Sequence, residues 1–422
     1  MIRMDIKAVC SLIDERKEEL FELLSSLIKI NSENFGSYGN EEEIANYIEK
    51  LCLEMELQTD KFSPLEIPDF ENHPDYFPGR NLENRYSVVA SLKGKEDKNG
   101  LMLMAHNDTV AIGDKEKWSV DPLGGIIKDG KIYGRGACDD KYAIATCLFV
   151  IKLLKEQGFI PKENLLMAAY SDEEYGGSHG ALSCVLKYPC DHIVSMDGRN
   201  REIWNCASGG QEAEYHFHAT ESTGTSETCA RAIPVVMDCI NEFGKRRYEE
   251  LEANKYYKGT DIPKISLRFL DVSVGQNGTN LESAKVGFEY YTDKTKEEIF
   301  KEYEETEKIL SNKLAPLGVT GDGIKPTTRF FHYVSCESDS DDIKLMQEAS
   351  KEATGIDVNV YPSCQSDYSV ILKYGSPKAF AFGNGKGFQQ EGGAHQANEY
   401  MECNRLVEYA KTIAAFIIKL LG

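Results

Sequence analysis

Several features that would indicate other classes of protein are missing from this chain of 422 residues. No run of about 20 apolar residues occurs, so we expect no membrane-spanning segment. The 12 cysteines include no Cys-x-x-Cys pair, which argues against a disulfide framework and against a cysteine-rich zinc site. Basic residues are outnumbered, with 48 Lys and Arg against 69 Asp and Glu. The resulting net charge of -21 disfavours nucleic acid and anionic membranes as partners.

The amino-terminal segment MIRMDIKAVCSLIDERKEEL also lacks the apolar stretch of a signal peptide. Several cysteines fall within apolar or helical patterns, which is typical of reduced core residues. Both observations indicate a cytoplasmic location. Hydrophobic residues make up 41% of the chain and charged residues 28%, a balance that is typical of a soluble globular protein with a large core.

Short apolar runs alternate with helical patterns in the first half of the chain. Strands are predicted at residues 86–92, 101–105, 164–170 and 192–196, and helices at 6–28, 41–57 and 141–157. Residues 62–84 contain four prolines and show no period, so they are predicted to form a long loop. This alternation favours an α/β fold with three layers and a mostly parallel sheet.

The character of the sequence changes after residue 205. Strands at 212–218, 265–274 and 285–291, with helices at 225–243 and 295–317, predict a small α+β unit. The alternation of strand and helix resumes from residue 328. We therefore expect a main domain in two parts, 1–206 and 321–422, and an inserted domain at 207–320.

Acidic residues and histidines cluster just past the predicted strand ends. They are His106, Asp108, Asp139, Asp140, Glu173, Glu174, Asp197 and, much later, His395. Ligands bind at this edge of open α/β sheets, so we expect these side chains to share one cleft. Imidazole and carboxylate donors without a thiolate cluster suit zinc, manganese or cobalt. The sequence therefore predicts a divalent-metal site in which Cys138 packs rather than binds.

Two pairs within this set suggest distinct roles. His106 and Asp108 are two residues apart in extended chain, so the carboxylate can accept an N–H from the imidazole and fix its tautomer. Glu173 and Glu174 diverge at a strand end, so one can bind metal while the other faces the substrate as a general base. Each pair alone is also typical of a solvated loop or acidic turn. The joint order of all these residues is what indicates a site.

That order resembles a known family. The motifs HNDTV, GRGACDDK, SDEEYGG, MDG and EGGAH occur in sequence, with a domain-sized gap before the last. They are similar to those of the acetylornithine deacetylase, succinyl-diaminopimelate desuccinylase and carboxypeptidase G family of two-zinc hydrolases, peptidase family twenty of the metallopeptidases. The resemblance covers nearly the whole chain and implies a catalytic α/β domain with an inserted lid and dimerisation domain.

The resemblance also implies a ligand set. Asp139 would bridge two divalent metal ions, zinc by resemblance and cobalt or manganese as alternatives. His106 and Asp197 would complete one metal site, and Glu174 and His395 the other. Each metal would then have three protein ligands and an open position for water.

Further roles follow from the same resemblance. Glu173 would be the general base, and Asp108 would orient His106. The peptide bond between Asp139 and Asp140 would be cis. Closure of the inserted domain would exclude water from the site.

The inserted domain departs from the family pattern at one turn. The usual Ala-His-Ser-x-x-Pro sequence is absent, so His218 or His216 is left as the candidate donor to the oxyanion. The stretch QNGTN resembles the glycine-rich segment of the family, which makes Asn280 a candidate substrate contact.

A second departure concerns substrate recognition near the carboxyl terminus. No arginine lies between Asp367 and His395 to receive a substrate carboxylate. The segment Gly383–Gly385 is then the expected source of backbone donors, through Gly383 and Asn384, because glycine allows close approach.

The function implied is hydrolysis of an amide bond in a small substrate, either a dipeptide or an N-acyl amino acid, with carbamoyl compounds as a further class. One alternative is a zinc aminopeptidase of the related clan, which the inserted domain disfavours. Another is a catalytically inactive metal-binding scaffold. The presence of Glu173, which is not needed as a metal ligand, argues against that alternative. The resemblance further implies a homodimer formed through the inserted domain.

Overall fold

The computed structural model describes residues 4–220, 226–276 and 280–422 of the chain. These residues form two compact units. Unit 1 comprises Met1–Asn205, Cys336–Tyr361 and Val370–Gly422, and unit 2 comprises Cys206–Ser335 and Pro362–Ser369. The insertion expected at residues 207–320 falls within unit 2.

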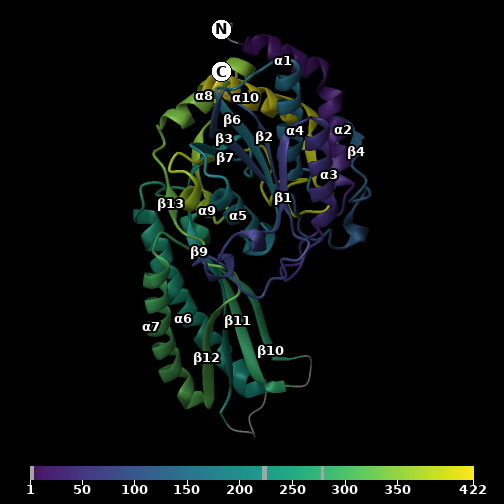
Figure 1. The fold of residues 1–422 in the computed structure, drawn as a ribbon. Coiled ribbons are helices and arrows are strands. Elements are labelled where there is room, and N and C mark those ends of the chain that lie inside the picture. Colours follow the sequence, from purple (N-terminus) through teal and green to yellow (C-terminus); the bar gives the residue numbers. More distant parts are fainter. Residues whose placement is uncertain (1–3, 221–225, 277–279) are drawn as a thin grey trace. The chain divides into compact units, whose positions relative to one another are not determined.

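Unit 1 is built on a large mixed sheet with the strand order β1-β2-β6-β3-β7-β15-β8 (Figure 1). Its strands are β1 (Gln58–Phe62), β2 (Ser87–Leu92), β3 (Glu96–His106), β6 (Glu163–Tyr170), β7 (His192–Ser195), β8 (Glu202–Ala207) and β15 (Phe380–Gly383). The central strands β6, β3, β7 and β15 run parallel, whereas β1, β2 and β8 pair antiparallel.

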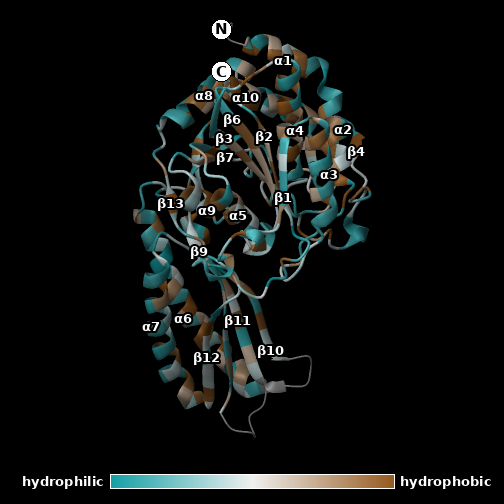
Figure 2. Ribbon diagram, in the orientation of Figure 1, coloured by the Kyte–Doolittle hydropathy of each residue, from teal (hydrophilic) through white to brown (hydrophobic). Residues whose placement is uncertain are grey.

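Strand β3 is buried on both faces. Leu101, Met102, Leu103 and Met104 are all 0% exposed, as expected where helices cover both sides of a parallel sheet. Figure 2 shows the central strands β2, β3 and β6 in the colours of hydrophobic residues. Leu101 and Leu103 join the main hydrophobic core, while the alternate residues point to the opposite face.

Helices cover the two faces of this sheet. The main core contains residues of α1 (Ile6–Glu15), α2 (Lys17–Ile28), α3 (Glu42–Glu54), α4 (Lys141–Glu156), α8 (Asp341–Thr354) and α10 (Cys403–Leu421). On the other face, α5 (His179–Lys187) contacts β2 and β6. A short helix, α9 (Tyr368–Val370), continues into a turn at Ile371–Gly375 that contacts α5. The predicted three-layer α/β architecture is confirmed.

The helix predicted at residues 6–28 is in fact two helices. They are separated at Arg16, whose φ of -107° and ψ of 13° are not helical. The Arg16 side chain forms ion pairs with Glu19 and with Glu156 of α4. The break contains neither glycine nor proline, so the apolar spacing alone did not reveal it.

A small sheet in unit 1 contains β4 (Ile126–Lys128), β5 (Lys131–Tyr133) and β16 (Tyr400–Glu402). A hairpin with Asp129 and Gly130 at its turn joins β4 to β5. Both turn residues have positive φ, 53° and 72°, the conformation that a tight Asp-Gly hairpin requires.

Unit 2 contains a four-stranded antiparallel sheet with the order β10-β11-β9-β12. Its strands are β9 (Gly209–Ala219), β10 (Leu267–Gln276), β11 (Asn280–Thr292) and β12 (Val319–Pro326). The long helices α6 (Ser226–Ala253) and α7 (Lys296–Leu314) pack on it. Two further short strands, β13 (Val334–Ser335) and β14 (Val360–Ser363), pair with β8 rather than with this sheet. None of the helices in the described residues has both the length and the apolar character that crossing a membrane requires.

Candidate active site

Three parallel strands of unit 1 bring their polar ends to one edge of the sheet. His106 is the last residue of β3 and pairs with Tyr170, the last residue of β6. Glu173 and Glu174 follow β6, and Asp197 follows the neighbouring strand β7. The register of the sheet therefore places these side chains on the side where α/β proteins bind ligands.

Asp139, which precedes α4, lies between two histidines. Its Oδ1 is 3.0 Å from Nε2 of His106, and its Oδ2 is 3.4 Å from Nε2 of His395. His395 Nε2 also lies 3.1 Å from Oε2 of Glu174. The peptide bond between Asp139 and Asp140 is cis, as the resemblance implied. The two oxygens of the Asp139 carboxylate thus face different imidazoles, one of His106 and the other of His395.

The donor atoms form three overlapping groups, in each of which all atoms lie within 4.8 Å of one another. The groups are His106, Asp139 and Asp197; Asp139, Glu174 and His395; and His106, Glu173 and Glu174. Every residue expected as a metal ligand belongs to at least one group. Asp139 is common to the first two groups, and Glu173 lies close to residues of both.

The carboxylates of this cluster stabilise positive charge on the histidines between them. Burial alone would lower the pKa of His395, but the Glu174 and Asp139 carboxylates raise it to about 11. Burial likewise opposes protonation of His106, yet hydrogen bonds with Asp108 and Asp139 raise its pKa well above the ordinary value. Clustered carboxylates favour nearby cations in this way. Imidazole and carboxylate donors of this kind fit two divalent metal ions.

Asp108 acts differently from the sequence-based expectation. Nδ1 of His106 is 2.9 Å from the backbone carbonyl oxygen of Asp108 and 3.6 Å from its carboxylate. The carbonyl oxygen is therefore the nearer acceptor. The carboxylate itself accepts the backbone N–H groups of Glu173 at 3.1 Å and of Glu174 at 3.0 Å. Asp108 thus holds His106 and also the turn that carries Glu173 and Glu174, which we call the glutamate turn.

Asn34 is a site residue that the sequence did not reveal. Its Nδ2 donates to Oδ2 of Asp108 at 2.8 Å and to the backbone oxygen of Glu174 at 3.0 Å. Asn34 is fully buried, in a segment predicted only as a connection between helices. A single asparagine in such a connection carries no sequence signal for this role.

Glu399 and Arg135 link the segments that carry Asp139 and His395. Glu399 accepts the N–H of Cys138 at 2.9 Å and an Arg135 N–H at 2.5 Å. Arg135 also donates to the backbone oxygen of His395 at 3.4 Å. Cys138 is 3% exposed and lies in the hydrophobic core, in accord with the packing role expected for it.

Two backbone N–H groups of the segment Gly383–Gly385 donate hydrogen bonds within the fold. The N–H of Asn384 donates to the Tyr142 hydroxyl at 2.7 Å, and the N–H of Gly385 donates to the Gly198 carbonyl at 2.9 Å. The Asn384 side chain is buried and donates to the backbone of Arg405. These contacts join the segment after β15 to its neighbours. The roles of Gly383 and Asn384 as substrate contacts stay predictions.

The remaining substrate candidates lie in unit 2. His218, on β9, faces Asp322 with 3.0 Å between Nδ1 and Oδ1. His216 on the same strand pairs with Glu214 at 2.7 Å. Asn280 begins β11, and its side chain lies outside the described residues. The roles of His218 and Asn280 stay predictions.

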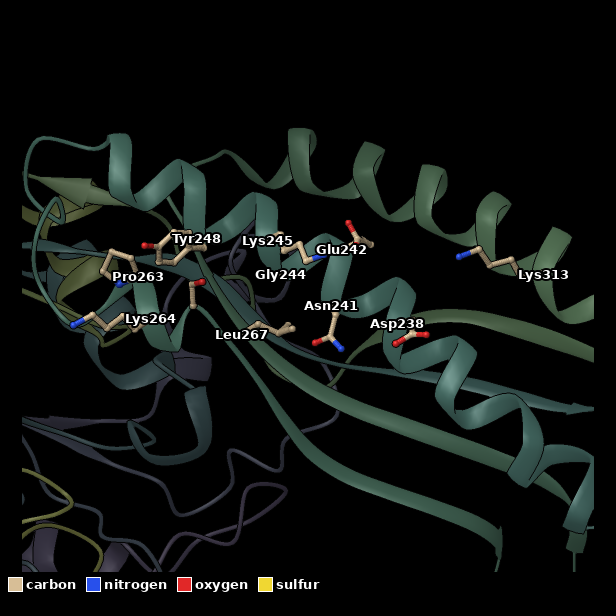
Figure 3. Close-up of a pocket in the computed structure, with 11 residues that line it drawn as sticks. Asp238, Asn241, Glu242, Gly244, Lys245, Tyr248, Pro263, Lys264, Leu267 and Lys313 are labelled. Atoms are coloured by element: carbon tan, nitrogen blue, oxygen red, sulfur yellow. Dashed lines mark hydrogen bonds and ion pairs between the residues drawn. The ribbon is translucent and has the colours of Figure 1, made fainter.

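Unit 2 also has an open cavity of about 650 Å³ beside α6 (Figure 3). Asp238, Asn241 and Lys245 of α6 line it, together with Lys264 and Lys313. Lys245 pairs with Glu242, and Lys264 pairs with Asp261. Such exposed ion pairs are typical of a solvated surface, so the cavity adds nothing to the catalytic candidates of unit 1.

Comparison with known proteins identifies the family. The model of peptidase family M20/M25/M40 matches residues 102–419. The chain belongs to this family. The match includes every candidate metal residue of unit 1, and it agrees with the resemblance read from the motifs.

Relatives of the M20/M25/M40 family support the same conclusion. An uncharacterised metallohydrolase of Methanocaldococcus jannaschii is 36% identical over 187 residues, which make up 43% of this chain and only 42% of that protein. The N-formyl-4-amino-5-aminomethyl-2-methylpyrimidine deformylase of Halalkalibacterium halodurans is 25% identical over 98% of this chain and 96% of its own length. The di-peptidase Dug1p of Saccharomyces cerevisiae has the same fold, with a TM-score of 0.74 at 16% identity over 99% of this chain and 98% of that chain. The chain thus belongs to a family of peptidases, and the Methanocaldococcus jannaschii relative is described as a metallohydrolase.

Proposed function

We propose that the protein hydrolyses an amide bond in a small substrate with two divalent metal ions. The observation that carries this proposal is the position of Asp139, whose two carboxylate oxygens face His106 and His395 separately. A carboxylate with that placement suits a bridge between two cations. With Asp197 on one side and Glu174 on the other, each cation would have three protein ligands, the number that leaves a position open in a catalytic site.

The reaction depends on Glu173. When bound, two divalent ions lower the pKa of a shared water and polarise the scissile carbonyl. Glu173 takes the proton of the attacking water and delivers it to the leaving amine nitrogen. Its position near His106 and Glu174 supports this role, and Asp108 fixes its backbone.

The substrate class proposed is a dipeptide or an N-acyl amino acid. Two relatives support it by what their names describe, a deformylase that acts on an N-formyl amine and a di-peptidase. His218 is the proposed donor to the oxyanion, and Asn280 a proposed substrate contact. We propose zinc as the metal by resemblance to the two-zinc hydrolases, since the imidazole and carboxylate donors suit zinc, manganese and cobalt alike.

Unit 2 is the proposed lid and dimerisation domain of this enzyme, which we place in the cytoplasm. Its β10 is an edge strand of the four-stranded sheet. Leu270 is 50% exposed and Val272 is 40% exposed on that strand. An exposed apolar edge strand is suited to pairing with a second copy.

The test of the proposed activity is a substrate panel with defined metals. The metal-free protein is reconstituted with zinc, cobalt or manganese and assayed on dipeptides, longer peptides with free amino termini, N-acyl amino acids and N-formyl amines. Hydrolysis that requires added metal is expected for at least one class. Two bound metals with no hydrolysis of any amide would instead support an inactive scaffold, and hydrolysis restricted to longer peptides with free amino termini would support an aminopeptidase.

A further inference from the structure

The turn that carries Glu173 and Glu174 has a backbone that is not stable by local preference alone. Asp172, Tyr175 and Ser178 all have positive φ, at 60°, 59° and 60°. Non-glycine residues rarely adopt this left-handed conformation. Such a turn persists only where surrounding contacts determine it.

Asp172 is the residue through which those contacts act. It is fully buried. Its Oδ1 accepts a hydrogen bond from Arg80 at 2.9 Å and forms an ion pair with the Arg85 guanidinium at 2.8 Å. Its Oδ2 lies 2.5 Å from Nδ1 of His179. Its backbone oxygen accepts the N–H of Ser178 at 2.6 Å. One carboxylate thus joins the turn to three basic side chains.

His179 links Asp172 to the proline-containing segment before β2. Its Nε2 accepts the backbone N–H of Phe77 at 3.1 Å, so the ring hydrogen is on Nδ1 and points at Asp172. Arg80, from the same segment, also donates to the backbone oxygens of Gly36 and Tyr175. This segment therefore holds the glutamate turn at two points. Arg80 bonds to the turn directly, and Phe77 bonds to His179, which in turn contacts Asp172.

The two sides of Glu173 are held by different groups. Asp108 accepts its N–H on the metal side, and Asp172 precedes it directly in the chain. Removing the contacts of Asp172 would loosen the chain segment that directly precedes Glu173. A displacement of a catalytic group by about 1 Å can reduce a rate 100-fold.

We propose that Asp172, His179 and Arg80 form a positioning cluster that fixes Glu173 and Glu174 in their working orientation. This rests on the proposed function, in which Glu173 is the base and Glu174 a metal ligand. None of the three cluster residues needs to touch substrate. Their effect passes through the backbone of the turn.

The chain offers a matched control for the His179–Asp172 pair. His192 Nδ1 lies 2.6 Å from Oδ2 of Asp342, a similar pair in the same unit. His192 begins β7, at the end of that strand opposite to Asp197. Loss of this pair should affect stability without affecting the site.

The experiment compares His179→Ala, His179→Asn and His192→Ala. All proteins are measured well below their melting temperatures, with kcat and KM on the best substrate and Co²⁺ affinity from the d–d absorption. We expect His179→Ala to lose 10- to 100-fold in kcat with KM changed less than threefold, and to bind Co²⁺ about tenfold more weakly. His179→Asn keeps a donor toward Asp172 and should recover most of the lost kcat. His192→Ala should retain kcat and Co²⁺ affinity within twofold.

A His179→Ala protein with wild-type kcat and Co²⁺ affinity but a lowered melting temperature would overturn the proposal, since the cluster would then only stabilise the fold. If His179→Ala does not fold, the same measurements on Arg80→Gln decide between the two outcomes. If the wild-type protein binds Co²⁺ but cleaves no amide, the proposed function fails, and the Co²⁺ affinities still decide whether the cluster positions the turn. Absence of both Co²⁺ binding and hydrolysis in the wild type would reject both proposals.

Discussion

The carboxylate of Asp108 accepts the backbone N–H of Glu173 through both of its oxygens, at 3.1 Å each. In Asp108→Asn, one carboxylate oxygen is replaced by an N–H₂ group. That group would face a backbone N–H of the glutamate turn, so two donors would oppose each other. We expect the variant to fold and to lose 10- to 100-fold in kcat, as is typical when a residue that supports a metal site is changed. Steady-state kinetics with measured metal content provide the check.

Asp342→Asn is the matched control for this variant, because Asp342 pairs with His192 at the end of β7 opposite to the candidate site. It should retain kcat within about twofold, given that surface and remote substitutions act mainly on stability. Equal activities for both variants would mean that Asp108 does not position the glutamate turn.

Glu173→Gln is expected to separate metal binding from turnover. The amide cannot accept the proton of the attacking water, so kcat should fall by roughly 100- to 10,000-fold. The ligand groups that contain Asp197 and His395 do not include Glu173. Metal content by mass spectrometry should therefore stay at the wild-type value. A Glu173→Gln protein with wild-type turnover would reject the base assignment.

The acid stability of unit 2 should depend on Glu302. Burial by itself raises the pKa of this carboxyl, but hydrogen bonds from Arg247 and Lys294 lower it to about 2. Because the unfolded-state pKa is about 4.3, the interaction stabilises the fold fully above that pH. The contribution is lost as the pH falls from about 4.3 toward 2.

Glu302→Gln should therefore destabilise the protein by about 2 kcal/mol at pH 7, a value reduced for partial exposure. The difference from wild type should shrink steadily below pH 4. Thermal unfolding between pH 3 and pH 7 measures this, with exposed Glu305→Gln on the same helix as control. A constant difference across that range would show that the ion pairs of Glu302 do not set the acid sensitivity.

Association of two chains should depend on the edge strand β10. Val272→Lys places a charge on that strand, where it is 40% exposed. Charged residues on an edge strand oppose pairing with another sheet. Light scattering after size-exclusion chromatography should give a dimer for the wild type and a monomer for Val272→Lys.

Ile309→Lys is the control for this substitution, because Ile309 is an exposed apolar residue on α7, at 49%. It should leave the dimer intact. A wild-type monomer, or a dimer that survives Val272→Lys, would contradict the proposed interface.

Much of unit 1 could be predicted because its central strands are buried on both faces. The run from Leu101 to Met104 needs no partner to be recognised as a buried strand, and the polar residues after it mark its ligand-binding end. The motif order then identified the candidate ligands. These are local signals, carried by residues that lie near one another in the chain.

Other features depend on contacts between distant segments. Asn34 gains its role only because the fold brings Asp108 and the Glu174 backbone to it. The backbone N–H of Asn384 donates to the hydroxyl of Tyr142 on α4, a contact that the neighbouring glycines did not reveal. Strand β12 (Val319–Pro326) contains two glycines and a proline that are typical of a turn, yet it forms the edge of a sheet, where such residues are tolerated.

Metal content per chain in the wild type and in Asp139→Ala tests the central claim most directly. The proteins are reconstituted with zinc, separated from free metal and analysed by mass spectrometry, with melting temperature as a check on folding. We expect two zinc ions per wild-type chain and loss of both from folded Asp139→Ala, because one carboxylate would serve both ions. Retention of one zinc at full occupancy in Asp139→Ala would contradict the bridge.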